Sequence, residues 1–515
     1  MSLGHALREW SAIVGEQHVI SGGEGIRAAS TATYPTTQGV PAIVRPLNGT
    51  QVQECVKVAA RHRVPLYPIS GGKNWGYGSR VPPVRGSVVL DLGRMKRIVA
   101  YDEEMAYVTV EPGVTQQILH DHLEQHGGKL WMDGTGSSPD ASILGNIVER
   151  GYGATVYGDH AGWAMGYEIV LPDGELLHTG YGAYPDAKMA ALDRWSPGPQ
   201  LDGLFSQSNL GIVTKVTIPL MPAPATTQLL MLDLADSERL ASAVDVMRGL
   251  QLDGTVRSSP WFGNCYRLLA ALGRFPWHRA EPPLSVALAE EIAAEHGLAR
   301  FTGFAALYGS FANVTASRRQ AVAAFRQADI PIQVIDDASL ARAADGGRRS
   351  IQVSMYRWYT GGIVNGVRRA YWRKRTPASP VMDPDRDGVG FIFVNASIPF
   401  RGKDIAEATE RAEEIVLAHG FEPAFSCHSV RPRAFIGLLA FAWDREVAGD
   451  DQRAFDAHDA VAREWASVGL YPVRLGLHSF NLIEDAEPTH RALLGTLKQA
   501  IDPHGVIAPG RYIPA

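Results

Sequence analysis

The residues with the clearest chemical potential are Pro68 to Gly78, PISGGKNWGYG, which combine four glycines with a lysine and an asparagine. Glycine allows positive φ and has no Cβ, so consecutive backbone amides can point at a bound phosphate. The side chains of Lys73 and Asn74 add further donors. We predict that this segment is a loop that holds a phosphate-bearing ligand. The alternative is an ordinary glycine-rich turn after the strand VPLYPI.

The sequence lacks the motifs of several other kinds of active site. No GxGxxG joins a strand to a helix, because GTGSSP fails at its last position, and neither a Walker lysine loop nor GxSxG is present. His120 and His122 are two residues apart on a predicted helix, so they point to different faces and we predict no metal site. Three scattered cysteines argue against a disulfide framework and favour core positions: Cys55, Cys265 and Cys427.

Length and composition indicate a folded enzyme with two domains. The 515 residues exceed the roughly 250 to 300 that one core usually serves. Hydrophobic residues make up 45% and charged residues 20%, and the net charge of -5 gives no basic field for nucleic acid. The N-terminus has no signal-peptide pattern and no run of about 18 apolar residues follows, so we expect a cytoplasmic protein with no membrane partner.

The hydrophobic patterns predict an α+β fold. After a polar helical start, strands and helices alternate up to residue 222, and Pro172-Asp173-Gly174 supplies the turn of a hairpin. Beyond residue 226, amphipathic helices alternate with strands such as GFIFVNASI, which predicts a second, α/β domain. The predicted boundaries are 1–222, 223–465 and 466–515, the last segment returning to the first domain.

The chain resembles the vanillyl-alcohol oxidase and 4-cresol dehydrogenase (PCMH-type) flavoproteins over nearly its whole length. The motifs that carry the resemblance occur in the family's order: PISGGKNWGYG, VEPGVT, LGN, ERGYG, YGDH, LPDGELLHTG, LFSQSNLGIVTK and DPHGVIAPGR. The resemblance implies a PCMH-type FAD-binding domain of two subdomains, and an α/β cap domain with a large antiparallel sheet. A separate cap that excludes water suits hydride transfer.

The resemblance also implies which residues bind FAD. The glycine-rich loop contributes the residues at the pyrophosphate, and later motifs contribute residues near the pyrophosphate, flavin or adenine. The set is Pro68, Ile69, Ser70, Gly71, Gly72, Lys73, Asn74, Trp75, Ser137, Ser138, Ser142, Gly145, Asn146, Gly153, Tyr157, Gly211, Ile212 and Arg511.

The same resemblance places Tyr77 and Arg474 at two of the three positions that hold a phenolate in the phenol-oxidising branch, with Val473 at the third. A cation beside the phenolate favours the charged form and eases hydride departure. Asp140 is a candidate general base, or else a loop residue that caps the following turn. His160 is a candidate proton acceptor, or else a structural histidine.

At the family's covalent flavin linkage the alignment gives Gly437, preceded by Ile436, and neither can form the bond. We therefore expect noncovalent FAD, unless His428 takes that role. The expected function is oxidation of a para-substituted phenol or aryl alcohol by hydride transfer to flavin N5. The alternatives are oxidation of a non-phenolic alcohol or hydroxy acid, and a flavin-binding protein with a decayed site. We expect a small aromatic substrate, O2 or an electron-transfer protein as acceptor, and a homo-oligomer.

Overall fold

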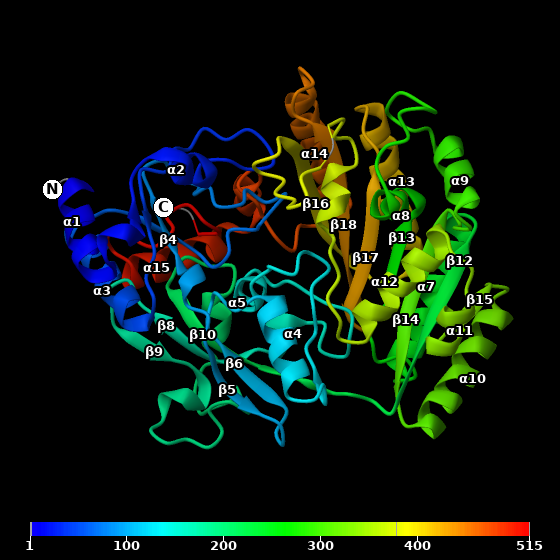
Figure 1. Ribbon diagram of the computed structural model, residues 1–515, viewed down its shortest axis with the longest axis horizontal. Coiled ribbons are helices and arrows are strands. Elements are labelled where there is room, and N and C mark those ends of the chain that lie inside the picture. The colour runs from blue at the N-terminus through cyan, green and yellow to red at the C-terminus, as the bar shows by residue number, and fades with distance from the viewer. Residues whose placement is uncertain (1–2, 377, 514–515) are drawn as a thin grey trace.

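The computed structural model describes residues 3–376 and 378–513, which form two lobes (Figure 1). One lobe contains the N-terminal strands and the C-terminal segment, and the other contains a seven-stranded sheet with its covering helices. The expected fold class is confirmed, because small sheets with helices make up the first lobe and a large antiparallel sheet makes up the second.

The first lobe begins with a four-stranded sheet in the order β1-β2-β4-β3. Strands β2, β4 and β3 are parallel and β1 is antiparallel to β2. Helix α3 starts at the Asn48 cap, whose side chain accepts from the Gln51 amide, and it buries Val52, Cys55 and Val56 against this sheet. The elements are β1 (Val19–Ile20), β2 (Ile43–Val44), β3 (Leu66–Ile69), β4 (Val88–Asp91), α1 (Leu3–Val14), α2 (Gly23–Ala29) and α3 (Gly49–His62).

A five-stranded antiparallel sheet, β5-β6-β10-β8-β9, forms the second part of this lobe and has its own core. A two-stranded sheet, β11-β7, leads to the other lobe. The elements are β5 (Ile98–Asp102), β6 (Tyr107–Val110), β7 (Leu130–Trp131), β8 (Met165–Val170), β9 (Leu176–His178), β10 (Ile212–Pro219), β11 (Met221–Pro222), α4 (Gln116–Gln125), α5 (Ile143–Val148) and α6 (His160–Trp163).

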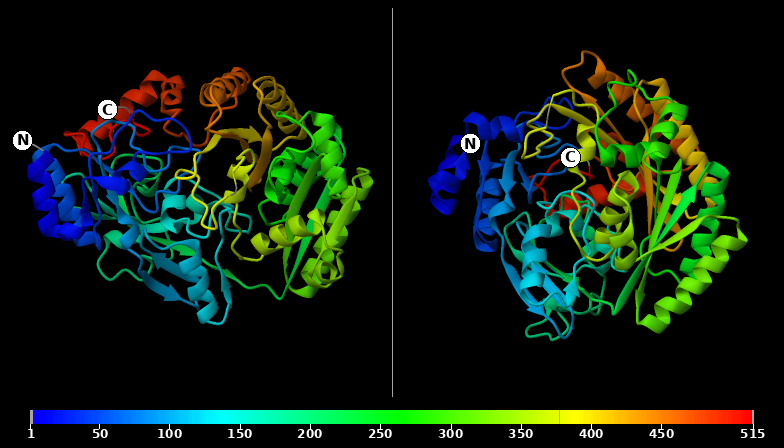
Figure 2. Two further views of the ribbon diagram at one scale, coloured as in Figure 1. Left: turned by 45° about the horizontal axis from the view of Figure 1, so that its top comes forward. Right: turned by 45° about the vertical axis from the view of Figure 1, so that its right-hand side comes forward.

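The second lobe, the cap, is built on the antiparallel sheet β15-β12-β14-β13-β17-β18-β16. Both faces of this sheet are covered, as the turned views in Figure 2 show. In β12 the side chains alternate, because Leu230 and Leu232 belong to one core and Leu229 and Met231 to the other. The strands are β12 (Thr226–Leu234), β13 (Trp261–Asn264), β14 (Phe301–Gly309), β15 (Ile332–Ile335), β16 (Val389–Pro399), β17 (Ala424–Arg431) and β18 (Ala434–Asp444).

The cap helices divide between the two faces. Helices α7, α10, α13 and α14 pack on one face, and α8, α9, α12 and the 3-10 helix η5 pack on the other. Their bounds are α7 (Ser237–Leu252), α8 (Cys265–Leu272), α9 (Val286–Glu295), α10 (Phe311–Gln327), α11 (Asp337–Arg342), α12 (Gly347–Tyr359), η5 (Val367–Tyr371), α13 (Gly402–Ala418) and α14 (Asp450–Ser467).

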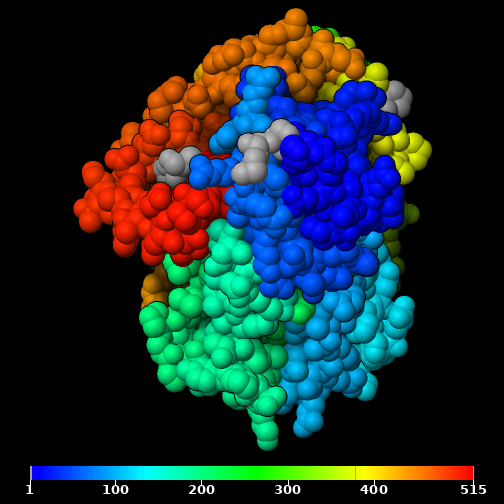
Figure 3. Space-filling model, turned by 90° about the vertical axis from the view of Figure 1, so that its left-hand side faces the viewer, coloured from blue at the N-terminus to red at the C-terminus, as the bar shows by residue number. Residues whose placement is uncertain are grey.

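The C-terminal segment returns to the first lobe through helix α15 (Pro488–Ile501). Leu66 donates its amide to the Val506 carbonyl and accepts from the Ala508 amide, so the tail runs beside β3. Figure 3 shows the same return on the surface, where the red segment borders the blue N-terminal part.

The three cysteines are free and buried, as expected. Within the described residues, no His, Cys, Asp and Glu cluster could hold a metal ion, and no helix is both long and apolar enough to cross a membrane.

Candidate functional site

A large cavity is lined by residues of both lobes and of the C-terminal segment. Its empty space, including the opening to solvent, is about 2080 Å³. The glycine-rich loop, the start of α5 and the tail line it from the first lobe. Strands β16, β17 and β18 line it from the cap. A dinucleotide-sized ligand would therefore lie between the backbone of the glycine-rich loop on one side and the side chains of the cap strands on the other.

The glycine-rich loop presents unused backbone donors to this cavity. None of the amides from Gly71 to Asn74 has a hydrogen-bond acceptor among residues 3–376 and 378–513. Gly72 has φ +65, a conformation that favours glycine. Amides without an acceptor in the protein are free to bind a ligand, so this loop has the donor set that a pyrophosphate requires.

The loop is fixed from behind by the cap. Trp75 Nε1 donates to Asp385 Oδ2 at 3.2 Å, and Ser79 Oγ donates to Asp385 Oδ1 at 2.7 Å. Burial raises the pKa of Asp385 to about 7. The side chain of Trp75 also packs in a cap core, so the loop is held between the two lobes.

The start of α5 forms the opposite side of the cradle. Ser142 caps this helix, because its Oγ accepts from the Gly145 amide at 2.9 Å and donates to the Pro112 carbonyl at 2.6 Å. A Cβ on Gly145 would lie 2.2 Å from Ser70 Oγ, so only glycine allows the loop and the helix to approach this closely.

Most of the predicted cofactor-binding residues line the cavity: Pro68, Ile69, Ser70, Gly71, Gly72, Lys73, Asn74, Trp75, Ser137, Ser142, Gly145, Asn146, Gly211, Ile212 and Arg511. Three others lie outside its lining. Ser138 Oγ accepts from the Asp140 amide, Gly153 packs against Asp133, and Tyr157 packs edge-on against Trp163 at 5.0 Å.

His160 and Asp140 also lie outside the lining. His160 is held between Asn146 Oδ1 at 2.6 Å and Asp133 Oδ1 at 2.8 Å, and it lines a small adjoining pocket. Its contact with the large cavity is indirect, through Asn146. The Asp140 side chain is 65% exposed and pairs with Lys73 Nζ at 3.0 Å. In this position Asp140 orients the loop lysine.

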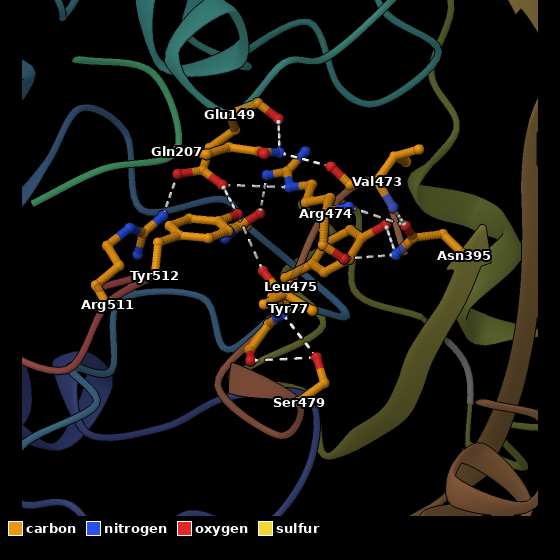
Figure 4. Close-up of polar contacts among 12 residues, drawn as sticks. Tyr77, Glu149, Gln207, Asn395, Val473, Arg474, Leu475, Ser479, Arg511 and Tyr512 are labelled. Carbon is orange, nitrogen blue, oxygen red and sulfur yellow. Dashed lines mark hydrogen bonds and ion pairs between the residues drawn. The ribbon is translucent and has the colours of Figure 1, made fainter. Parts of the chain in front are cut away.

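Tyr77 and Arg474 come together at the cavity wall (Figure 4). The Arg474 guanidinium carbon lies 4.5 Å from the centre of the Tyr77 ring. The Tyr77 ring also stacks on Phe393, with 5.1 Å between the ring centres. Burial raises the pKa of Tyr77 well above its usual value, although the charge of Arg474 opposes this. Tyr77 therefore stays protonated and can donate a hydrogen bond.

Asn395 on β16 fixes the segment that carries Arg474. Its Oδ1 accepts from the amides of Val473 at 2.9 Å and Arg474 at 3.0 Å, and its Nδ2 donates to the Arg474 carbonyl at 2.8 Å. Val473 presents no hydroxyl, and its carbonyl accepts from Gln207 Nε2 at 2.8 Å. The phenolate site expected from the resemblance is thus reduced to Tyr77 and Arg474.

Glu149 balances the charge of two arginines beside the cavity. It forms an ion pair with Arg511, lies 3.5 Å from Arg474 Nε, and accepts from the Tyr512 hydroxyl at 2.9 Å. Burial acts to raise the pKa of Glu149, but the charges of Arg511 and Arg474 outweigh it and lower the pKa. This carboxylate therefore joins the tail to the first lobe.

The cap wall offers little for a covalent flavin bond. A side chain at Gly437 would lie 2.5 Å from Ile398 Cδ1, in the core on the far face of the sheet, whereas Ile436 and Leu438 line the cavity. His428, paired with Ile436 across β17 and β18, also lines it. His428 is 3% exposed, and its Nδ1 has no partner among the described residues.

The sequence analysis did not single out several polar residues of the cavity, among them Glu149, Asn395, Arg267 and Arg369. Three had a signal. Glu149 stands in the ERGYG motif, Asn395 interrupts the apolar strand GFIFVNASI, and Arg267 interrupts the apolar helix CYRLLAAL. Arg369 had none, because Arg368 beside it has the same type and faces solvent.

The FAD binding domain family matches residues 40–180 of the chain. The chain is 38% identical to the 1'-carboxy-chondrochloren decarboxylase of Chondromyces crocatus, across 99% of this chain and 97% of that protein. It is 26% identical to the flavoprotein subunit of 4-cresol dehydrogenase (hydroxylating) of Pseudomonas putida, across 98% of this chain and 94% of that protein. The chain belongs to the PCMH-type flavoprotein family.

Two solved structures share the whole PCMH-type fold. Substrate-bound p-cresol methylhydroxylase superposes with a TM-score of 0.91 at 24% identity, covering 100% of this chain and 98% of that one. The 4-ethylphenol oxidase from Gulosibacter chungangensis, in an isoeugenol complex, gives 0.91 at 25% identity, covering 99% and 97%. The protein is thus an FAD-dependent oxidoreductase of the PCMH type, and the unpaired loop amides fit the FAD pyrophosphate.

Proposed function

We propose that this flavoprotein oxidises a para-substituted phenol at its benzylic carbon. The observation that carries the proposal is the pairing of Arg474 with Tyr77 at the cavity wall, beside an apolar group formed by Phe391, Phe393, Ile436 and Leu438. The names of two full-length relatives, a 4-cresol dehydrogenase and a 4-ethylphenol oxidase, support a phenolic substrate.

The residues of the chain would act as follows. Arg474 stabilises the phenolate by its charge, and the protonated Tyr77 donates a hydrogen bond to the same oxygen. The aromatic and aliphatic side chains of the cap exclude water and orient the ring. FAD, when bound, accepts the hydride. The oxidised substrate, a quinone methide, then adds water or loses a group.

Loss of carbon dioxide is a second candidate outcome. It is favoured by the full-length relative named as a decarboxylase and by two further arginines, Arg267 and Arg369, in the cavity. If the neighbouring carbon carries a carboxylate, the electron pair of its carbon–carbon bond can form a new double bond. The phenolate is restored and CO2 leaves, so no further oxidant is consumed.

We expect 4-ethylphenol to bleach the flavin absorbance near about 450 nm when it is mixed with the protein without oxygen, because it supplies a benzylic hydride. Benzyl alcohol, which has no phenol, should react far more slowly. Equal reaction with 4-ethylphenol and benzyl alcohol would favour a non-phenolic substrate, and no reaction with either would favour a decayed site. With 3-(4-hydroxyphenyl)propanoate, 4-vinylphenol and CO2 would mark the decarboxylating outcome.

We also propose that the FAD is noncovalent. Acid precipitation should release the yellow colour into the supernatant, because Gly437 points away from the cavity and Ile436 and Leu438 cannot form a bond. Colour that stays in the pellet would contradict this. His428→Ala would then show whether His428 is the attachment residue. If it is, acid precipitation of this variant should release the flavin into the supernatant.

Three further proposals concern the electron acceptor, the cellular compartment and the assembly of the protein. The electrons would pass to dioxygen or to an electron-transfer protein. The protein would be cytoplasmic and would form a homodimer or larger homo-oligomer.

A further inference from the structure

The cap side of the cavity carries two arginines without a carboxylate partner. Arg267 lies on α8 and Arg369 on η5, and both line the cavity. Arg267 Nε donates to Ser426 Oγ at 3.3 Å, and Arg369 donates to the Gly136 carbonyl at 2.8 Å. These contacts fix the two guanidinium groups but do not neutralise them. Among the described residues, no Asp or Glu forms an ion pair with either of them.

The other arginines of the cavity differ in this respect. Arg474 and Arg511 share the carboxylate of Glu149. Arg267 and Arg369 are instead near each other, because α8 and η5 pack together and both side chains line the same cavity. Burial lowers the pKa of both, and the charge of Arg267 lowers the pKa of Arg369 further. Two like charges held together away from water are costly unless an anion joins them.

A third polar group faces the same space. His428 is buried and lines the cavity, and its Nδ1 has no partner among the described residues. Burial lowers its pKa well below the usual value, and both arginines add to the effect. The ring is therefore neutral and offers a hydrogen bond rather than a charge. Tyr152, 4.8 Å from His428 between ring centres, lies at the same wall.

We propose that Arg267 and Arg369 form a carboxylate-binding subsite, so that the substrate is a phenol whose para substituent carries a carboxylate. Guanidinium groups match carboxylates in shape and charge. The Tyr77 and Arg474 pair would hold the phenol end, and Tyr152 lines the same cavity as the three arginines. This inference rests on the proposed function for the phenol end.

The test uses ligands without a benzylic carbon, so that binding is measured without turnover. Suitable probes are (4-hydroxyphenoxy)acetate and 3-(4-hydroxyphenoxy)propanoate, each compared with its neutral amide of nearly the same shape. Dissociation constants come from the change in the flavin absorbance spectrum and from calorimetry. In the unaltered protein, the better of the two carboxylates should bind at least about tenfold tighter than its amide.

Arg267→Gln and Arg369→Gln should each remove most of that preference and leave binding of the amide within about twofold. Arg368→Gln is the matched control, because Arg368 lies on the same 3-10 helix and is exposed. This control should keep the preference. FAD content and thermal unfolding, measured for all three variants, show that they fold and bind the cofactor.

The inference is overturned if the unaltered protein binds neither carboxylate more tightly than its amide, a comparison that needs no variant. It is also overturned if the preference survives in both glutamine variants, or if these variants lose FAD, which would assign the arginines to the cofactor. Failure of the proposed function has a different signature. In that case 4-ethylphenol leaves the flavin oxidised and the amides do not bind, whatever the carboxylates do.

Discussion

Arg474→Ala is expected to lower kcat/KM for 4-ethylphenol by about 100-fold to 1000-fold, the usual loss when a main electrostatic partner of a developing charge is removed. The guanidinium lies over Tyr77 at the cavity wall and is the cation to which the proposed function assigns the phenolate. Without it the phenol keeps its proton, and the hydride leaves less readily. The measurement is the rate of anaerobic flavin reduction at a series of substrate concentrations.

Three controls separate this effect from damage to the fold. Glu149 keeps Arg511 and Tyr512 as partners in the variant, so FAD content and unfolding temperature should change little. The residual rate of the variant should rise with pH. Without the charge of Arg474 the phenol has a higher pKa, so a higher pH is needed to form the phenolate. Benzyl alcohol should lose little. An equal loss with both substrates would show that Arg474 positions the site generally and does not stabilise a phenolate.

The backbone cradle was the part of the site most open to prediction from sequence. Its chemistry depends on glycines at fixed spacing, and Gly71 and Gly72 reach the cavity because the loop directly follows β3. The pattern of strands and helices likewise predicted the α+β fold class, since the four- and five-stranded sheets of the first lobe and the cap sheet bury periodic apolar residues.

The cap side of the cavity was less predictable, because its residues meet only through long-range pairing. Asn395 and Arg474 are 79 positions apart, and Arg267 reaches Ser426 across 159 positions. A one-residue change of strand register also reverses which side chain faces the cavity. This is why position 437 suggested a lost linkage, whereas residues 436 and 438 line the cavity.

His160 and Asp140 illustrate a different limit. Both are chemically suited to proton transfer, and both stand in the sequence close to residues that the resemblance assigns to FAD binding. Their side chains are nevertheless engaged elsewhere, His160 with Asn146 and Asp133 and Asp140 with Lys73. Residue type indicates what a group can do, but its orientation decides whether it reaches the ligand.

Arg511→Met is expected to lower the free energy of unfolding by about 3 kcal/mol, because it leaves the buried carboxylate of Glu149 without its main counter-ion. The Tyr512 hydroxyl and Arg474, at 3.5 Å, compensate only in part. Since the tail also lines the cavity, FAD should dissociate more readily. Urea unfolding with and without added FAD measures both effects. The double variant Glu149→Gln, Arg511→Met should recover part of the loss, because it removes the unpaired carboxylate and leaves only the charge of Arg474 at this site.

The pH dependence distinguishes charge from packing. In the unaltered protein the folded-state pKa of Glu149 is lowered, so its contribution to stability is present above its ordinary pKa and is lost as the pH falls through the folded-state value. In Arg511→Met, burial is less opposed and the pKa of Glu149 should rise, so protonation relieves the unpaired charge. The stability deficit should therefore be largest near neutral pH and shrink toward about pH 4. A deficit that stays constant with pH would mean that Arg511 acts mainly by packing against Tyr67 and Phe480.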